Sequence, residues 1–125
     1  MRRVVITGFG GVTALGNDWE SIKAGLLAHQ NCVVRMPQWD EIDGLSAKLA
    51  APVQNFTLPE HYTRKRVRSM GRVSLLSTRA TELALEDAGL LENPVIKSGR
   101  TGIAFGSCTG STNAVAAFGE MLTNK

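Results

Sequence analysis

The chain has 125 residues, of which 43% are hydrophobic and 20% charged, values typical of one soluble globular domain. It contains no apolar run of about 18 residues, and glycines interrupt the apolar stretch after the basic first residues, so we expect neither a membrane span nor a signal peptide. Two cysteines are too few for a disulfide scaffold and lack metal-ligand spacing with His29 or His61, which favours a reduced, cytoplasmic location and no metal site.

The first predicted element is a buried strand over residues 4–9 that runs into a glycine-rich turn. Gly8 and Gly10 fit the start of a dinucleotide-binding fingerprint, but Thr13 stands where a third glycine is needed. No Gly-Lys-Ser/Thr sequence ends the turn, as a Walker loop would require. We therefore interpret the glycines as positions of tight turns and close backbone packing.

A helix is predicted next, over residues 18–28, with Asn17 as N-cap and Glu20 completing a near capping box. His29 follows its last turn, where a histidine interacts favourably with the helix terminus. The proline-containing stretch 30–63 reads as irregular, with a short strand at 53–56.

The second half begins with a long amphipathic helix over 66–88, which Gly89 is expected to terminate. After a turn at Asn93-Pro94, a second buried strand is predicted at 101–105 and a third helix at 112–122. This alternation indicates an α/β domain with a largely parallel sheet. Two central strands are few for three helices, so we expect the chain to be a piece of a larger protein.

The segment Gly106-Ser107-Cys108-Thr109-Gly110 matches a nucleophile elbow, which would make Cys108 a catalytic thiol. Such hydrolases place their histidine after the nucleophile, and no histidine follows Cys108. His61 sits in a polar loop, where a solvated side chain is expected. A small buried thiol is thus the favoured interpretation of Cys108, with a small cysteine hydrolase as the alternative.

Much of the net charge of +3 comes from one basic cluster, formed by Arg64, Lys65, Arg66, Arg68 and Arg72. On one continuous helix, Arg64, Lys65, Arg68 and Arg72 would share a side and suit phosphates or an acidic helix, although a solvated face is the plain alternative. No aromatic residue is interleaved to stack a base, so nucleic acid is not the expected partner.

Three stretches together resemble the start of a β-ketoacyl-acyl carrier protein synthase, the condensing enzyme of type II fatty acid synthesis. Residues 3–10 with Gly16-Asn17 resemble its opening strand, turn and helix cap. Residues 64–70 with 84–90 are similar to its long helix and helix stop, and 101–107 to the following strand and glycine-serine turn. The resemblance covers the whole chain in order.

The resemblance implies a fold class and a reaction. Residues 1–125 would be an incomplete N-terminal portion of the N-terminal thiolase-like domain, an α/β fold that in the complete protein has five αβαβα layers. Members act as homodimers and condense an acyl thioester with malonyl-acyl carrier protein, with loss of carbon dioxide, using no metal or organic cofactor. Their catalytic cysteine and two histidines are expected beyond Lys125, so this chain carries no catalytic residue and is expected to be inactive alone.

Two sites follow from the resemblance. Arg64, Lys65 and Arg68 stand where the family docks the acidic carrier protein, and Cys108 and Thr109 stand near its acyl pocket and dimer contact. Ser69 and Gly71 replace a further basic residue and an aspartate, and Cys108 replaces a frequent glycine, which leaves room for a polyketide- or polyene-type synthase. A non-catalytic, chain-length-setting subunit of a heterodimer is the remaining alternative.

Overall fold

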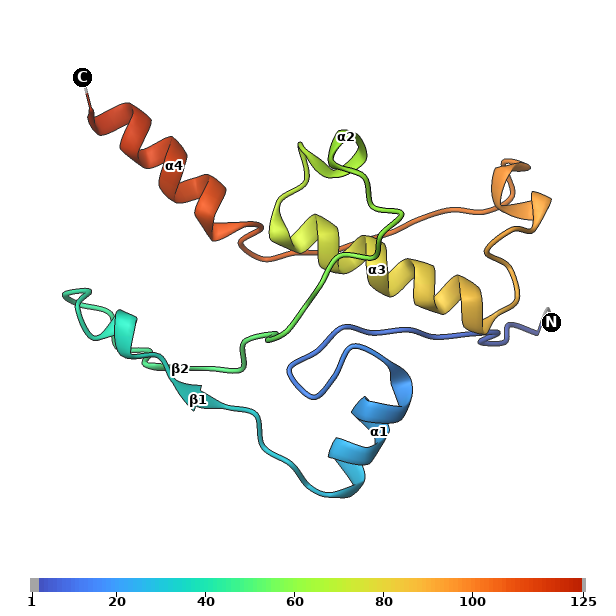
Figure 1. Cartoon of the computed structure of the whole chain (residues 1–125), viewed down its shortest axis with the longest axis horizontal. Helices are drawn as coiled ribbons and strands as arrows, with labels where there is room; N and C mark the ends of the chain where they lie inside the picture. The colour runs from blue at the N-terminus through green and yellow to red at the C-terminus, as the bar shows by residue number, and fades with distance from the viewer. Residues whose placement is uncertain (1–2, 125) are drawn as a thin grey trace. The chain divides into compact units, whose positions relative to one another are not determined.

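The computed structural model describes residues 3–124. Its α-helices are α1 (Trp19–Leu27), α2 (Arg64–Val67), α3 (Arg72–Asp87) and α4 (Thr112–Thr123), its strands are β1 (Val34–Arg35) and β2 (Leu49–Ala50), and short 3-10 helices span Pro37–Trp39 and Pro94–Lys97 (Figure 1). By their contacts, residues 3–10 and 58–124 form one unit and residues 11–57 another.

In the second unit, the N-cap of α1 is Asp18 rather than the predicted Asn17. Asp18 Oδ1 accepts the Ser21 backbone N–H at 2.8 Å, and Ser21 Oγ donates to Asp18 Oδ2 at 2.8 Å. The backbone and side-chain hydrogen bonds from Ser21 hold the pKa of Asp18 below its usual value. The predicted cap is wrong by one residue because Asn17 instead donates from Nδ2 to the Asn55 carbonyl, at 3.4 Å.

The other end of α1 is closed through the backbone of His29. This residue adopts a left-handed conformation, with φ of 52°, and its N–H donates to the Leu26 carbonyl at 3.1 Å. The next N–H, of Gln30, donates to the Gly25 carbonyl at 2.9 Å, which completes a Schellman motif. His29 therefore does end the helix, as predicted. Ile22, 9% exposed, is the one apolar side chain buried among residues 3–124.

The sheet differs from the prediction. Among residues 3–124 it consists of β1 and β2, paired antiparallel with Val34 opposite Ala50 and Arg35 opposite Leu49. The predicted strand at 53–56 is not formed, and a largely parallel sheet is not present in the described part of the chain. A hairpin-type pair needs only nearby residues, whereas parallel pairing needs a long crossover and a second central strand in register.

The first unit is built around α3, against which the opening segment packs closely. A Cβ on Gly10 would lie 2.6 Å from the Ala84 backbone N, and one on Gly8 would lie 2.6 Å from the Ala88 backbone N. The Phe9 N–H between them donates to Asp87 Oδ2 at 3.0 Å. The glycines thus serve close backbone packing, as the sequence indicated, and the small residues of α3 make the matching surface.

The long helix predicted over 66–88 is two helices, so that prediction is wrong at its N-terminal end. The four-residue α2 ends at Val67, and α3 starts after an extended Gly71. Glycine is a poor helix former, and adjacent positive charges along 64–68 repel each other. The predicted stop is confirmed: Gly89, with φ of 65°, and Leu90 donate to the Glu86 and Leu85 carbonyls at 3.0 and 2.8 Å.

The two predicted central strands are not strands here. Segments 4–9 and 101–105 are not assigned to any strand, and Ile6 and Ile103 are 89% and 75% exposed. β-rich composition favours extended backbone, but a strand exists only with a hydrogen-bonded neighbour. The third helix is confirmed within one residue, as α4, although its apolar residues Phe118 and Met121 are 57% and 66% exposed.

Candidate functional site

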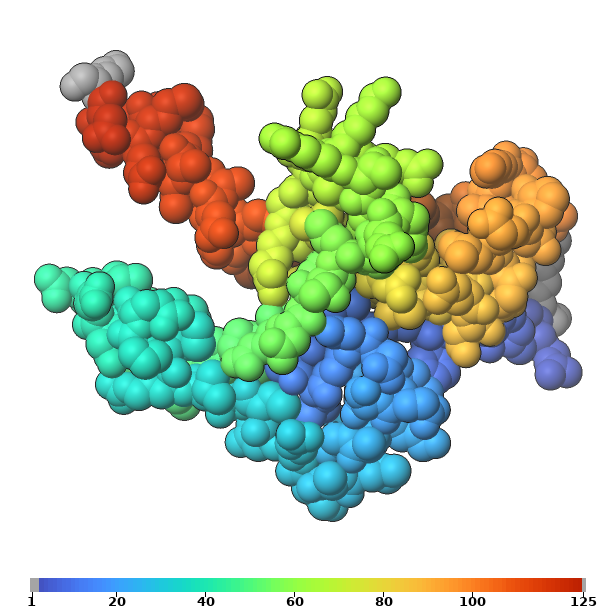
Figure 2. Space-filling model, in the orientation of Figure 1, coloured from blue at the N-terminus to red at the C-terminus, as the bar shows by residue number. Residues whose placement is uncertain are grey.

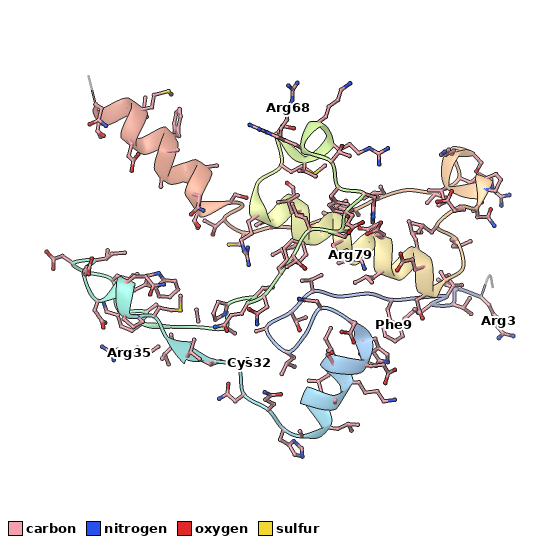
Figure 3. The ribbon with its side chains drawn as sticks, viewed as in Figure 1. Arg3, Phe9, Cys32, Arg35, Arg68 and Arg79 are labelled. Atoms are coloured by element: carbon pink, nitrogen blue, oxygen red, sulfur yellow. The ribbon has the colours of Figure 1, made fainter. Side chains whose placement is uncertain are left out.

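The basic cluster lies on α2 and on the turn that leads to α3. Arg64 and Lys65 are in the first turn of α2, Arg68 is its C-cap, and Arg72 opens α3 instead of continuing the same helix. The side chains of Arg64, Lys65, Arg66 and Arg68 are exposed. In Figure 2 long side chains stand out from the surface at α2, and in Figure 3 Arg68 points away from α3.

The four cations on α2 and at its C-cap are not neutralised by other residues that the structure describes. Among residues 3–124, Arg64, Lys65, Arg66 and Arg68 form no ion pair, whereas Arg35 and Arg79 are each paired with a carboxylate. Figure 3 shows Arg35 at β1 and Arg79 on α3. Exposed, unpaired like charges cost little to solvate, and they generate a local positive potential that attracts an anionic surface.

Helix α2 is too short to be stable through its own interactions. Four residues are far below the length at which an isolated helix is stable in water. Thr63 caps it without a side-chain hydrogen bond, and positive charge in the first turn opposes the helix dipole. Its orientation therefore depends on contacts outside the helix.

A polar cluster next to α2 provides such contacts. Glu82 of α3 bonds His61 Nε2 through Oε1 at 2.5 Å, accepts the Tyr62 hydroxyl at Oε2 at 3.2 Å, and pairs with Arg79. Its side chain is 14% exposed. Burial alone would raise the pKa of Glu82, but the hydrogen bonds from Arg79, His61 and Tyr62 outweigh it and leave that pKa below its usual value.

The same contacts act on Tyr62. Burial, and then the nearby Glu82 carboxylate, raise the pKa of the Tyr62 hydroxyl, so it stays a hydrogen-bond donor at neutral pH. His61 was expected to be solvated; its side chain is 54% exposed, yet it is bonded to Glu82. The sequence reasoning missed Glu82, for which the i,i+3 spacing of Arg79 and Glu82 was the available signal.

A cavity of about 370 Å³ separates the α2 segment from α3. On the α2 side it is lined by Tyr62, Val67 and Met70, and on the α3 side by Glu82 and Leu85. Segment 101–105 contributes the side chains of Ile103 and Phe105. The apolar packing under α2 is consequently incomplete, which leaves the polar contacts of Glu82 as a main support.

The second predicted site, Cys108 and Thr109, lies in an exposed turn. The Ser107 hydroxyl accepts the Gly110 N–H at 3.0 Å, and Gly110 takes a φ of 69°, so the turn is organised by its neighbours rather than by Cys108. The expectation of a buried thiol is wrong for this structure, because segment 101–105, which precedes the turn, is itself exposed. His61 bonds Glu82 through Nε2, and no hydrogen bond joins it to Cys108 among residues 3–124.

Within residues 3–124, no group of three or more histidine, cysteine, aspartate or glutamate residues is placed to hold a metal ion. Over the same residues, no helix has the length and apolar character needed to cross a bilayer.

Comparison with known proteins now identifies the family. Residues 1–124 match the family model described as the N-terminal domain of β-ketoacyl synthases. The chain belongs to this family. The predicted α/β class, as the N-terminal part of a thiolase-like fold, is confirmed by this match and by a solved relative: a β-ketoacyl synthase from Burkholderia phymatum is 52% identical, with a TM-score of 0.87. That alignment covers 100% of this chain and 31% of the solved one.

Curated proteins are also similar to this chain. The 3-oxoacyl-[acyl-carrier-protein] synthase 1 of Haemophilus influenzae is 35% identical over 90% of the chain, and synthase 2 of Vibrio cholerae is 32% identical over 99% of it. Nodulation protein E of a Rhizobium species is 39% identical over 71%. The chain spans less than a third of these proteins: 27%, 30% and 22% of their lengths.

Proposed function

We propose that residues 1–125 are the N-terminal portion of a β-ketoacyl-acyl carrier protein synthase. The match of residues 1–124 to the family's N-terminal domain, supported by the 52%-identical solved synthase, is the observation that carries this proposal. The complete enzyme would condense an acyl thioester with malonyl-acyl carrier protein in fatty acid or polyketide/polyene synthesis. It would work in the cytoplasm, as a homodimer or as part of a ketosynthase-like heterodimer.

The exposure of apolar residues supports a larger protein. One buried isoleucine stabilises a fold by about 1.5–3 kcal/mol, while ordering a single residue costs about 1–2 kcal/mol of backbone entropy. Segments 4–9 and 101–105 and the apolar face of α4 would gain their burial against the remaining two thirds of the synthase. In the sheet of that enzyme both segments would find their strand partners.

The residues present in the chain determine which parts of the enzyme it would supply. The nucleophilic cysteine and two histidines would lie beyond Lys125, so the chain alone has no first step for a covalent mechanism. The present chain would supply part of the scaffold, a wall of the acyl pocket that includes Cys108 and Thr109, and the docking surface for the acidic carrier protein. No metal or organic cofactor is proposed, since the substrate arrives on the carrier's phosphopantetheine arm.

The reaction is tested with the full-length protein supplied with acyl- and malonyl-acyl carrier protein. We expect a ketoacyl product and release of carbon dioxide, and no product from the 125-residue chain. Product formation by the short chain would contradict the assignment of catalysis to residues beyond Lys125. Absence of condensation by an intact, folded full-length protein would instead favour the chain-length-setting subunit.

The docking surface is tested by reversing charge at Lys65→Glu and Arg68→Glu together in the full-length protein. The exposed, unpaired state of these side chains leads us to expect at least tenfold weaker binding of holo-acyl carrier protein at low salt, with the difference shrinking as salt is added. The measurement is a titration at several ionic strengths. Lys97→Glu with Arg100→Glu, an equal charge change outside the cluster, is the matched control; equal weakening by both pairs would contradict specific docking.

A further inference from the structure

We propose that Glu82 is a positioning residue that holds the basic helix α2 in its docking orientation. The inference deepens the proposed function and rests on it for the identity of the partner, but the contact that carries it lies wholly inside the chain. A carboxylate on α3 bonds two side chains, His61 and Tyr62, that lie just before the N-cap of α2.

Glu82 is suited to this role because it is itself fixed. Its side chain is 14% exposed, and Arg79, one helical turn earlier, pairs with it and keeps it charged. α3 is the longer of the two helices, with 16 residues and hydrogen bonds from outside the helix at its start and from Gly89 and Leu90 at its end. The charge-assisted bonds that Glu82 offers to the 58–63 loop are stronger than bonds between neutral groups.

α2 needs an external support because it has little of its own. It has four residues, its charges repel, and a cavity of about 370 Å³ lies between its segment and α3. Regions with few buried apolar contacts open locally at low free energy. The hydrogen bonds of His61 and Tyr62 to Glu82 fix the position of the loop just before α2. They therefore also restrict the positions of Arg64 and Lys65, which follow in the first turn of α2.

The apparent affinity for the carrier protein depends on the fraction of molecules in which α2 has its docking orientation. If α2 samples other orientations, the carrier protein meets the binding-competent one in only a fraction of molecules, and the apparent affinity falls by that fraction. Saturating substrate draws all molecules into the binding-competent orientation, so the loss disappears at high concentrations of carrier-linked substrate. Removal of Glu82 should therefore raise the KM for carrier-linked substrate and leave kcat unchanged.

The decisive experiment uses Glu82→Ala in the full-length protein, with Glu86→Ala as matched control. Glu86 is an exposed carboxylate one turn further along α3 that lies 4.0 Å from Arg79 and is not bonded to the 58–63 loop. We expect Glu82→Ala to weaken binding of holo-acyl carrier protein about fivefold, with unchanged kcat, and Glu86→Ala to change neither. A conservative Glu82→Gln, which retains an acceptor for Tyr62, should recover part of the affinity.

Amide hydrogen exchange in the protein without carrier tests the same contact independently. We expect faster exchange of residues 61–68 in Glu82→Ala, with residues 76–86 of α3 unchanged, and a similar effect from His61→Ala combined with Tyr62→Phe. Unchanged exchange and affinity in Glu82→Ala would overturn the positioning role, even if the Lys65 and Arg68 reversal still weakens docking. If that reversal has no effect but residues 61–68 exchange faster, the docking assignment fails while Glu82 still holds α2.

Discussion

Helices α1 and α3 end in the same way but begin differently. Each is closed at its C-terminus by a Schellman motif, with His29 in the left-handed position of α1 and Gly89 in that of α3. At its N-terminus, α1 uses its own Asp18. The N-cap of α3 is Gly71, which has no side chain to accept a hydrogen bond. The Ser111 hydroxyl, 38 residues away, accepts the Val73 N–H instead, at 3.4 Å.

The difference teaches how far apart in sequence the determinants of a helix lie. α1 is delimited by neighbours, so its ends are readable from a short window. α3 is capped by the hydroxyl of Ser111 and is contacted closely by Gly8 and Gly10, which tertiary structure brings against it. The following substitutions, measured in the full-length protein, test this contrast from the largest expected effect to the smallest.

Gly10→Ala should be the most damaging. The new Cβ would lie 2.6 Å from the Ala84 backbone N and 2.7 Å from the Ala80 carbonyl, and helix backbone cannot yield as a side chain can. We expect a loss of about 3 kcal/mol in the free energy of unfolding, measured by chemical denaturation. Gly11→Ala is the control, because its Cβ would meet Ile22 Cδ1 at an ordinary 3.5 Å. Equal losses would mean that α3 does not depend on this close approach.

A second pair of changes moves the cap of α3 from a distant residue to a local one. Gly71→Asp alone places a Cβ 2.2 Å from Ser111 Oγ and displaces the hydroxyl, and Ser111→Gly alone leaves the Val73 N–H without it. Each is expected to lose about 1 kcal/mol. The double variant should regain most of that loss. Removal of the Ser111 side chain leaves space for the aspartate, whose carboxylate can accept hydrogen bonds from the first backbone N–H groups of α3.

A double-mutant cycle of unfolding free energies measures this effect. Simple additivity of the two losses would show that Gly71 and Ser111 do not act on the same helix end.

The smallest effects are expected at the matching C-terminal positions. Gly89→Ala should destabilise the protein by about 1 kcal/mol, because a Cβ is disfavoured at a φ of 65°. His29→Gly should have the opposite sign and stabilise it by about 0.5 kcal/mol, since relief of that strain exceeds the greater entropy of glycine in the unfolded chain. Thermal unfolding measures both effects. His29→Asn is the control, because asparagine tolerates the left-handed conformation. If Gly89→Ala and His29→Gly changed the stability in the same direction, the left-handed positions of α1 and α3 would not be equivalent.

The site shows the same limits of prediction as the fold. The exposed cations Arg64, Lys65 and Arg68 were identifiable from their density in the sequence, and the structure leaves them unpaired. Their support by Glu82 was not identifiable, because the bonds to His61 and Tyr62 span 21 and 20 residues. The strands predicted at 4–9 and 101–105 have the right composition, yet composition supplies no hydrogen-bonded neighbour.

The sequence by itself determined the features that depend on neighbouring residues: the end of α1 at His29, the stop at Gly89, the span of α4, the basic cluster and the resemblance to the family. Tertiary structure alone decided the break at residues 68–71, the cap that Ser111 lends to α3, the contact of Gly8 and Gly10 with that helix, and the bonds that tie the 58–63 loop to Glu82. The physical reason is range. Backbone conformation and capping are settled within a turn or two of the chain, whereas close packing, shared hydrogen bonds and strand pairing exist only when distant segments meet.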